Sequence, residues 1–280
     1  MTTVQPHTLK SLGPIHPPKA EKRALKPTVA RHIQIPVRDT LNHEAPAIIH
    51  EPRSYSTLQA QGAAVVLVSG AGGGVSGPSG IYPSLADKLA LLISIPCIRL
   101  DYRHPAQTDY CTADIAASLD YLWQQYNSTR FVIVGWSFGS SPCITAAANE
   151  PDRIRGVASI GSQLAGTDGI TQLTPRPFLL LHGADDAVLS ASSSQTLYQQ
   201  YGTEGYRDIK LFPGGDHGLT GHAPEAEGMI LAFAAKTLGF ERLLDYETMD
   251  QARRDLVESS DERKREMEQG HDLEGGERIS

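Results

Sequence analysis

The residue of this sequence whose surroundings most clearly suggest chemistry is a serine in a glycine-flanked turn. From Arg130 to Ser141, an apolar, β-branched run leads directly into Gly-x-Ser-x-Gly, with Ser137 at its centre, and an alanine-rich segment follows. This order predicts a strand, a very tight turn and a helix, with the serine hydroxyl displayed at the apex. Gly135 and Gly139 are expected where a Cβ would collide with a neighbouring element. A serine displayed in this way can attack a carbonyl carbon.

A serine hydroxyl becomes a competent nucleophile when an imidazole accepts its proton and a carboxylate orients that imidazole. A buried run of apolar residues ends at His182, and Asp185 and Asp186 follow a glycine turn directly after it. The next apolar run leads into a glycine-rich loop that contains His217. Because both loops follow strands, we expect them at the same sheet edge as Ser137. His182 itself is expected to be structural.

Three motifs together resemble those of the α/β-hydrolase superfamily. They are the serine turn at 135–139, His-Gly-x-x-Asp at 182–186 and Asp-His-Gly at 216–218. The resemblance covers about residues 45–240, and the chain order serine, aspartate, histidine is the one that this architecture uses. It implies a serine hydrolase that cleaves a carboxylic ester or a related acyl bond in a small-molecule substrate. The resemblance implies neither a cofactor nor a metal.

The resemblance also assigns a role to each matching residue. Ser137 corresponds to the nucleophile, Asp186 to the acid that orients the base, and His217 to the general base. Asp185 competes for the acid role, and the spacing from the preceding His-Gly pair favours Asp186. His222 competes for the role of base, but it lies further along, near the start of the last helix.

Acyl transfer also needs two hydrogen-bond donors for the oxyanion of the tetrahedral intermediate. The backbone N–H of Phe138, the residue after the serine, is expected to be one donor. The other is expected in the glycine-rich loop 69–74, where the resemblance favours Ala71, with Gly72 next. Ser69 stands where a His-Gly pair often occurs in the superfamily, so this loop departs from the common pattern.

The elements that must position these residues alternate along the chain. Apolar runs with little polar alternation predict buried strands, and helical patterns lie between them. We expect strands at Arg31–Val37, Ala47–Glu51, Ala63–Ser69, Ile95–Tyr102, Arg130–Trp136, Ile154–Ile160, Phe178–His182 and Asp208–Phe212, and helices at Tyr82–Leu92, Thr112–Tyr126 (with Thr112 as N-cap), Phe138–Asn149, Ala191–Tyr201 and Pro224–Leu238. This alternation implies a doubly wound, mostly parallel sheet flanked by helices.

The segment after the strand that follows the serine helix bears on how open the site is. Residues 162–177 are rich in Gly, Thr and Pro and are too few to form a helical cap domain. We therefore expect an α/β-hydrolase fold without a cap. Among α/β-hydrolases this resembles the small branch of dienelactone hydrolase-like proteins and simple carboxylesterases.

The two ends of the chain differ from its middle. Residues 1–30 form a Pro/Lys-rich leader without periodicity, and residues 241–280 are highly charged. We expect a disordered leader, one hydrolase domain at 31–240 and a tail that is partly helical or disordered.

Composition excludes some classes of function. The net charge of −7 argues against a nucleic-acid-binding surface. No apolar run approaches the roughly 20 residues that span a bilayer. Three sparse cysteines suit a reducing compartment, so we expect a cytoplasmic protein. The basic leader also resembles an organelle transit peptide, although its prolines would interrupt the helix that such a peptide needs.

Two other classes of function fit parts of the sequence. A Gly-x-Gly-x-x-Gly pattern at 72–77 follows a strand, and Asp101 ends the next one, as in a dinucleotide-binding turn for NAD(P). However, the pattern begins several residues past the strand, and Pro78 delays the helix. Asp101 is then expected to be an ordinary strand-end residue paired with Arg103. The second alternative is a non-catalytic ligand-binding or scaffold protein of the same fold.

Overall fold

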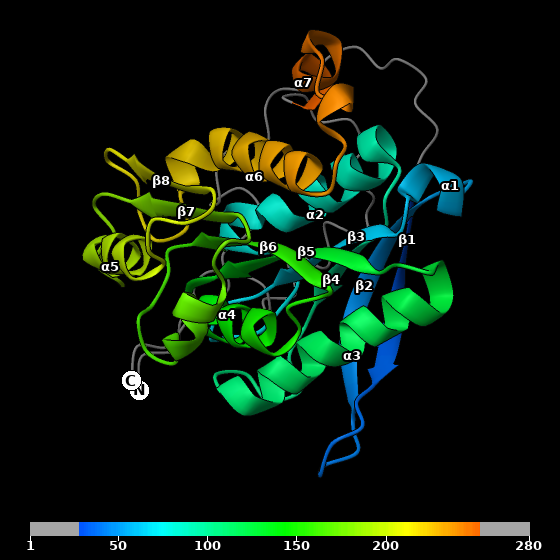
Figure 1. Ribbon diagram of the computed structural model, residues 1–280, viewed down its shortest axis with the longest axis horizontal. Helices are drawn as coiled ribbons and strands as arrows, with labels where there is room; N and C mark the ends of the chain where they lie inside the picture. Colours follow the sequence, from blue (N-terminus) through cyan, green and yellow to red (C-terminus); the bar gives the residue numbers. More distant parts are fainter. Residues whose placement is uncertain (1–27, 253–280) are drawn as a thin grey trace, which may run out of the picture.

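The computed structural model describes residues 28–252; most of the expected leader (1–30) and tail (241–280), namely residues 1–27 and 253–280, lies outside the described residues. In the described part, an eight-stranded sheet has the order β1-β2-β4-β3-β5-β6-β7-β8 (Figure 1). The strands are β1 (Thr28–Pro36), β2 (Glu44–Pro52), β3 (Ala63–Val68), β4 (Cys97–Leu100), β5 (Arg130–Trp136), β6 (Ile154–Ile160), β7 (Phe178–Gly183) and β8 (Arg207–Phe212). β2 pairs antiparallel with β1 and β4, and the other pairs are parallel. The predicted fold class is confirmed.

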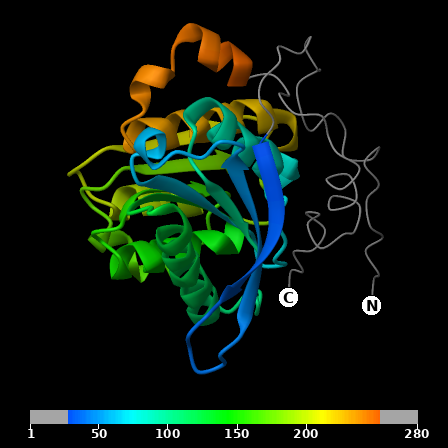
Figure 2. The ribbon, with the colours of Figure 1, turned by 90° about the vertical axis from the view of Figure 1, so that its right-hand side faces the viewer.

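Helices cover both faces of this sheet (Figures 1 and 2). The helices are α1 (Thr57–Ala60), α2 (Ile81–Lys88), α3 (Thr108–Tyr126), α4 (Ser140–Asn149), α5 (Ser192–Gln200), α6 (Ala223–Thr237) and α7 (Tyr246–Ala252). Apolar residues of α2 and α6 form one core with one face of the strands, and those of α3, α4 and α5 form a second core with the other face. Because β3 and β5 are covered on both sides, their side chains are buried almost throughout.

Element boundaries differ from the sequence predictions at several ends. α3 begins at Thr108, one turn before the predicted start. Thr112 is therefore not an N-cap: its hydroxyl lies inside the helix and donates to the carbonyl of Thr108 at 2.7 Å. The helix after β3 continues beyond α2 through a π-helical turn, Leu89–Ile93. The predicted strand Ile95–Tyr102 shrinks to β4.

The register of the parallel strands brings their carboxyl ends to one edge. Val68 pairs with Gly135, Gly135 with Ser159, and Ile160 with Leu181. The chain order reverses at β3, since β4 lies on one side of it and β5 on the other. In open α/β sheets, ligands bind at the carboxyl edge beside such a reversal. The loops after β3 and β5 meet there.

The turn after β5 packs backbone against backbone. A Cβ on Gly135 would lie 2.5 Å from the carbonyl oxygen of Gly139, and a Cβ on Gly139 would lie 2.3 Å from the carbonyl oxygen of Ser69. Both distances are well inside van der Waals contact. The sequence prediction that these two positions exclude a side chain is confirmed.

The connection between β6 and β7 contains no cap. Within the described residues, its regular structure is a short 3-10 helix at Asp168–Gln172. The hydroxyl of Ser141 in α4 donates to the carbonyl of Gly166 at 2.8 Å and holds this connection against α4, the helix that follows the serine turn at 135–139. That turn is called the elbow below. The prediction of a fold without a cap domain is confirmed.

The backbone contact at Gly139 predicts a local steric penalty. Gly139→Ala is expected to lower the free energy of unfolding by about 1–3 kcal/mol or more, because the new methyl group overlaps the Ser69 carbonyl. Gly228→Ala is the matched control, since a Cβ there, inside α6, meets nothing within 4 Å. It should be neutral or stabilise by up to about 1 kcal/mol. Urea denaturation of both variants measures the difference; equal stabilities would contradict the packing described for the elbow.

Candidate active site

Ser137 lies at the tip of the turn that follows β5. Its φ is 54°, in the left-handed region that non-glycine residues rarely adopt. The residue is 3% exposed and begins the 3-10 turn Ser137–Gly139 that leads into α4. A strained, non-glycine backbone at a strand-to-helix turn is the geometry that the sequence motif predicts.

Asp186 and His217, which lie far apart in the sequence, are hydrogen-bonded to each other. His217 Nδ1 lies 2.7 Å from Asp186 Oδ2, and the carboxylate side chain is fully buried. The other carboxylate oxygen accepts the backbone N–H groups of Val188 and Leu189, each at 2.8 Å. The turn after β7 therefore holds the carboxylate by backbone contacts that do not involve the imidazole.

His217 lies against the strand that carries the serine. The indole N–H of Trp136 donates to the carbonyl of His217 at 3.3 Å, and the two ring centroids are 5.7 Å apart. Directly after the neighbouring strand β6, a Cβ on Gly161 would lie 3.2 Å from the imidazole. The structure thus brings Asp186 and His217 together beside the residue that precedes Ser137. Proton transfer between His217 and Ser137 stays a prediction.

The two competing residues have other surroundings. The Asp185 side chain is exposed, and its backbone N–H donates to the carbonyl of Gly215 at 3.0 Å. His222 places Nε2 at 3.1 Å from the carbonyl of Pro213, and its ring packs against Phe212. The observed geometry therefore favours Asp186 and His217 over their competitors.

The surroundings of Asp186 stabilise its ionised form. Burial alone would raise the pKa of the carboxyl group. Hydrogen bonds from His182, His217 and the backbone N–H of Leu189 outweigh burial and hold the pKa well below its ordinary value. The carboxylate is charged at neutral pH and can stabilise a positive charge on the imidazole.

The loop after β3 is anchored next to the elbow. The hydroxyl of Tyr102 donates to the carbonyl of Ser69 at 3.0 Å, and Asp101 Oδ1 accepts the backbone N–H of Gly74 at 2.7 Å. The expected oxyanion donors, Ala71 and Phe138, belong to this loop and to the elbow, which meet at the Gly139 contact. Their role as donors stays a prediction.

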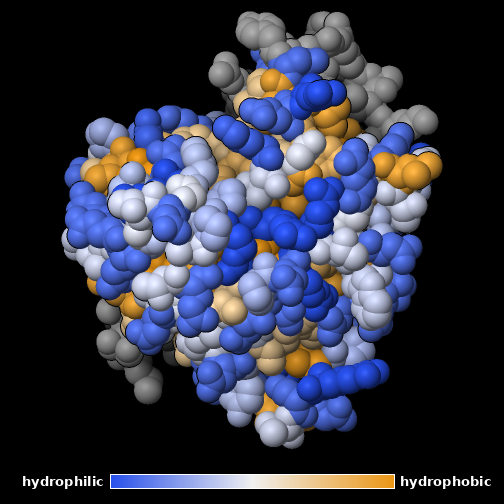
Figure 3. Space-filling model, in the orientation of Figure 1, coloured by the Kyte–Doolittle hydropathy of each residue, from blue (hydrophilic) through white to orange (hydrophobic). Residues whose placement is uncertain are grey.

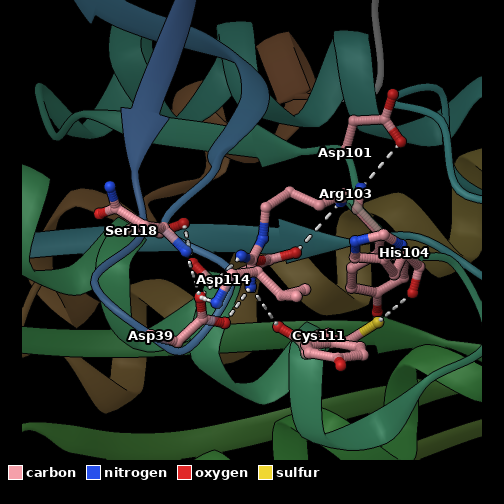
Figure 4. Close-up of polar contacts among 11 residues, drawn as sticks. Asp39, Asp101, Arg103, His104, Cys111, Asp114 and Ser118 are labelled. Carbon is pink, nitrogen blue, oxygen red and sulfur yellow. Dashed lines mark hydrogen bonds and ion pairs between the residues drawn. The ribbon is translucent and has the colours of Figure 1, made fainter.

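Arg103 holds the loop after β4 in place through two carboxylates, as Figure 4 shows. Its guanidinium lies 2.9 Å from Oδ2 of Asp39, a residue of the β1–β2 turn. The guanidinium also binds the buried carboxylate of Asp114 in α3. The hydrogen bonds from Arg103 lower the pKa of Asp39 to about 2, whereas burial raises the pKa of Asp114. The expected pairing of Arg103 with Asp101 is therefore wrong, because the guanidinium is used by the two other carboxylates.

The glycine pattern at 72–77 has a structural explanation other than nucleotide binding. A Cβ on Gly77 would lie 2.4 Å from the ring of Tyr82, whose hydroxyl donates to the carbonyl of Val68 at 3.0 Å. A 3-10 turn at Pro78–Gly80 separates the pattern from α2. The Asp101 carboxylate binds backbone N–H groups of the protein itself. These features weaken the dinucleotide interpretation.

Sequence reasoning missed four residues that contact this site. Asp101 and Tyr102 anchor the loop after β3, Trp136 contacts His217, and His182 binds the Asp186 carboxylate. A signal existed for His182, because it belongs to the same short motif as Asp186. For the other three, the partners are backbone atoms of distant segments, and no local pattern indicates such contacts.

The face in Figure 3 is mostly hydrophilic, with scattered apolar residues of the ordinary kind. Within residues 28–252, no group of three or more His, Cys, Asp or Glu side chains could hold a metal ion. No helix in that range combines the length and the apolar character needed to cross a bilayer.

Comparison with known proteins identifies the fold. A family profile described as alpha/beta hydrolase fold matches residues 63–175. No curated protein sequence matches the chain significantly. The profile extends from β3 to near the end of the β6–β7 connection, and so includes the loop after β3 and the serine elbow.

Solved structures extend the likeness over most of the chain. Est1E from Butyrivibrio proteoclasticus has a TM-score of 0.59 at 15% identity, covering 74% of this chain and 99% of its own. The dienelactone hydrolase from Anabaena variabilis gives 0.58 at 15%, covering 71% and 95%. XC6422 from Xanthomonas campestris, an α/β serine hydrolase without a lid, gives 0.56 at 14%, covering 76% and 97%. The resemblance stated from the sequence is confirmed at the level of the fold: this chain has the α/β-hydrolase fold, with no cap domain between β6 and β7.

Proposed function

We propose that this protein is a serine hydrolase that cleaves a carboxylic ester or a related acyl bond of a small molecule. In this proposal Ser137 is the nucleophile, His217 the general base and Asp186 the residue that orients the base. The backbone N–H groups of Ala71 and Phe138 bind the oxyanion. The esterase and serine hydrolase names among the structural neighbours support this choice of reaction.

The hydrogen bond between Asp186 and His217 carries the proposal. Because Nδ1 faces a carboxylate oxygen at 2.7 Å, the ring hydrogen resides on Nδ1. Nε2 is then the ring nitrogen that carries the lone pair and can accept a proton. The His217 side chain is 10% exposed and can exchange a proton with a group in the site, whereas the Asp186 side chain is fully buried. An imidazole oriented by a buried carboxylate is one of the two contacts that serine activation requires; the contact between His217 and Ser137 is part of the proposal.

The proposed reaction proceeds in two halves. The Ser137 oxygen forms a bond to the acyl carbon while His217 Nε2 takes the hydroxyl proton, and His217 then gives that proton to the departing alcohol oxygen. Water attacks the acyl-enzyme, again losing a proton to His217, and the Ser137 oxygen leaves with that proton. Asp186 remains ionised throughout and stabilises the imidazolium ion. The open connection between β6 and β7 admits substrate without the movement of a cap.

Covalent labelling tests the nucleophile. A fluorophosphonate probe should label the wild-type protein, and Ser137→Ala should abolish labelling, because the probe forms its bond to the serine oxygen. His217→Gln should slow labelling by about 10³-fold or more, whereas His222→Gln, the control, should leave the rate unchanged. Mass spectrometry locates the adduct. A folded wild type that remains unlabelled would support the non-catalytic alternative.

The pH profile tests the base. The rate of labelling should fall as the pH drops through the histidine range, near roughly 6–7, because a protonated imidazole cannot accept the serine proton. Stopped-time labelling between pH 5 and 8 measures this decline. A flat profile over that range would count against His217 as the base.

Acid stability tests the environment of Asp186. Because its pKa is lowered in the folded protein, its contribution to stability is present above the ordinary carboxyl value near pH 4 and is lost as the pH falls further. Asp186→Asn should therefore lose less stability than the wild type when the pH falls from about 5 to 2. Some dependence should remain, because Asp39 also has a lowered pKa. Urea midpoints at successive pH values measure the effect; identical slopes would contradict it.

A further inference from the structure

His182 shares the carboxylate oxygen that orients the proposed base. Its Nε2 lies 3.1 Å from Asp186 Oδ2, the atom that also binds His217 Nδ1 at 2.7 Å. Oδ1 is occupied by the backbone N–H groups of Val188 and Leu189. The carboxylate therefore holds two backbone donors on one oxygen and two imidazole groups on the other.

The His182 ring is held in one orientation. The side chain is fully buried in β7, with Nδ1 at 2.7 Å from the Ser194 hydroxyl of α5. On the opposite side, Nε2 faces the carbonyl of Leu189 at 3.0 Å as well as Asp186. Because both groups that face Nε2 are acceptors, the ring hydrogen must reside on Nε2. The Nε2–H is thus shared between the Leu189 carbonyl at 3.0 Å and Asp186 Oδ2 at 3.1 Å, and the Ser194 hydroxyl can donate to the other ring nitrogen.

We propose that His182 is a positioning residue for the proposed reaction: its Nε2–H fixes Asp186 Oδ2 and tunes the basicity of His217 through that shared oxygen. The inference rests on the proposed function of Asp186 and His217. His182 does not contact substrate in this scheme, since its side chain is fully buried.

The direction of the effect follows from charge. A hydrogen bond from His182 draws negative charge away from Oδ2, so that less charge is available to stabilise the protonated form of His217. Loss of this donor should make Asp186 a stronger acceptor for His217 and raise the pKa of the imidazole. The same loss frees the carboxylate to rotate, which misaligns the base.

His182 contacts the same carboxylate as His217. Among the contacts described within residues 28–252, the titratable groups on Asp186 are His182 of β7 and His217 of the loop after β8. Asp216, adjacent to His217, directs its carboxylate to the backbone N–H of Thr220 at 2.8 Å. Asp185 is exposed. Trp136 and Gly161, which face the imidazole from β5 and the end of β6, carry no charge.

Two amide variants separate the position of the donor from its chemistry. In His182→Gln the amide nitrogen can take the place of Nε2 and donate to Asp186. In His182→Asn it takes the place of Nδ1, so that the contact with Ser194 can persist while the donor to Asp186 is lost. Fluorophosphonate labelling across pH 5 to 9 is the readout. In His182→Asn the acid limb, the part of the pH profile where the labelling rate falls at low pH, should move to higher pH by about 0.5 unit, and labelling should slow by about tenfold. In His182→Gln the acid limb should stay at the wild-type pH.

The outcomes separate this inference from the proposed function. Absence of labelling in the folded wild type defeats the proposed function. Normal labelling of Ser137, combined with a wild-type limb and rate in folded His182→Asn, overturns the role of His182 alone. If His182→Asn does not fold, ring ¹⁵N spectra of the wild type decide the matter. His182 must carry its hydrogen on Nε2 throughout the titration of His217, and a hydrogen on Nδ1 alone would overturn the proposal.

Discussion

The architecture of the site depends on the close approach of two backbones. The carbonyl of Ser69 at the end of β3 lies where a side chain on Gly139 would stand, and the Gly139 carbonyl lies equally close to Gly135. Removing two Cβ atoms lets the elbow descend onto the neighbouring strand, which brings the loop after β3 beside Ser137. Tyr102 then binds the same Ser69 carbonyl and holds this arrangement from the other side. The meeting of the two loops is thus a consequence of sterics before it is a matter of chemistry.

Two buried carboxylates near this edge show how the count of donors decides the state of an acid. Asp186 collects two backbone donors and two imidazole groups, and these outweigh burial, so its pKa falls. Asp114 is equally buried and contacts Arg103, yet burial prevails and its pKa rises. Arg103 divides its guanidinium between Asp114 and Asp39. Asp186 can therefore stabilise a positive charge on His217, whereas Asp114 mainly holds α3 against the loop that carries Arg103.

Local patterns were sufficient for most of the fold. β5 and β6 have the predicted bounds, because apolar β-branched runs bounded by turn residues leave little freedom. Ends set by tertiary contacts were not predictable: α3 gains a turn before Thr112, and β4 loses residues at both ends. At the site, motif spacing indicated Asp186 and His217. The contacts of Asp101 and Trp136 involve backbone atoms far away in sequence, and the double contact of His182 depends on χ angles that no sequence pattern specifies.

At Ser137, whose backbone is left-handed, low backbone strain and the presence of a hydroxyl group favour different residue types. An L-residue in this conformation costs about 1–2 kcal/mol relative to an ordinary turn, whereas glycine adopts it freely. Glycine at 137 would relax the elbow but would carry no oxygen for the proposed chemistry. The folding free energy and the proposed chemistry therefore favour different residues at this one position of the chain.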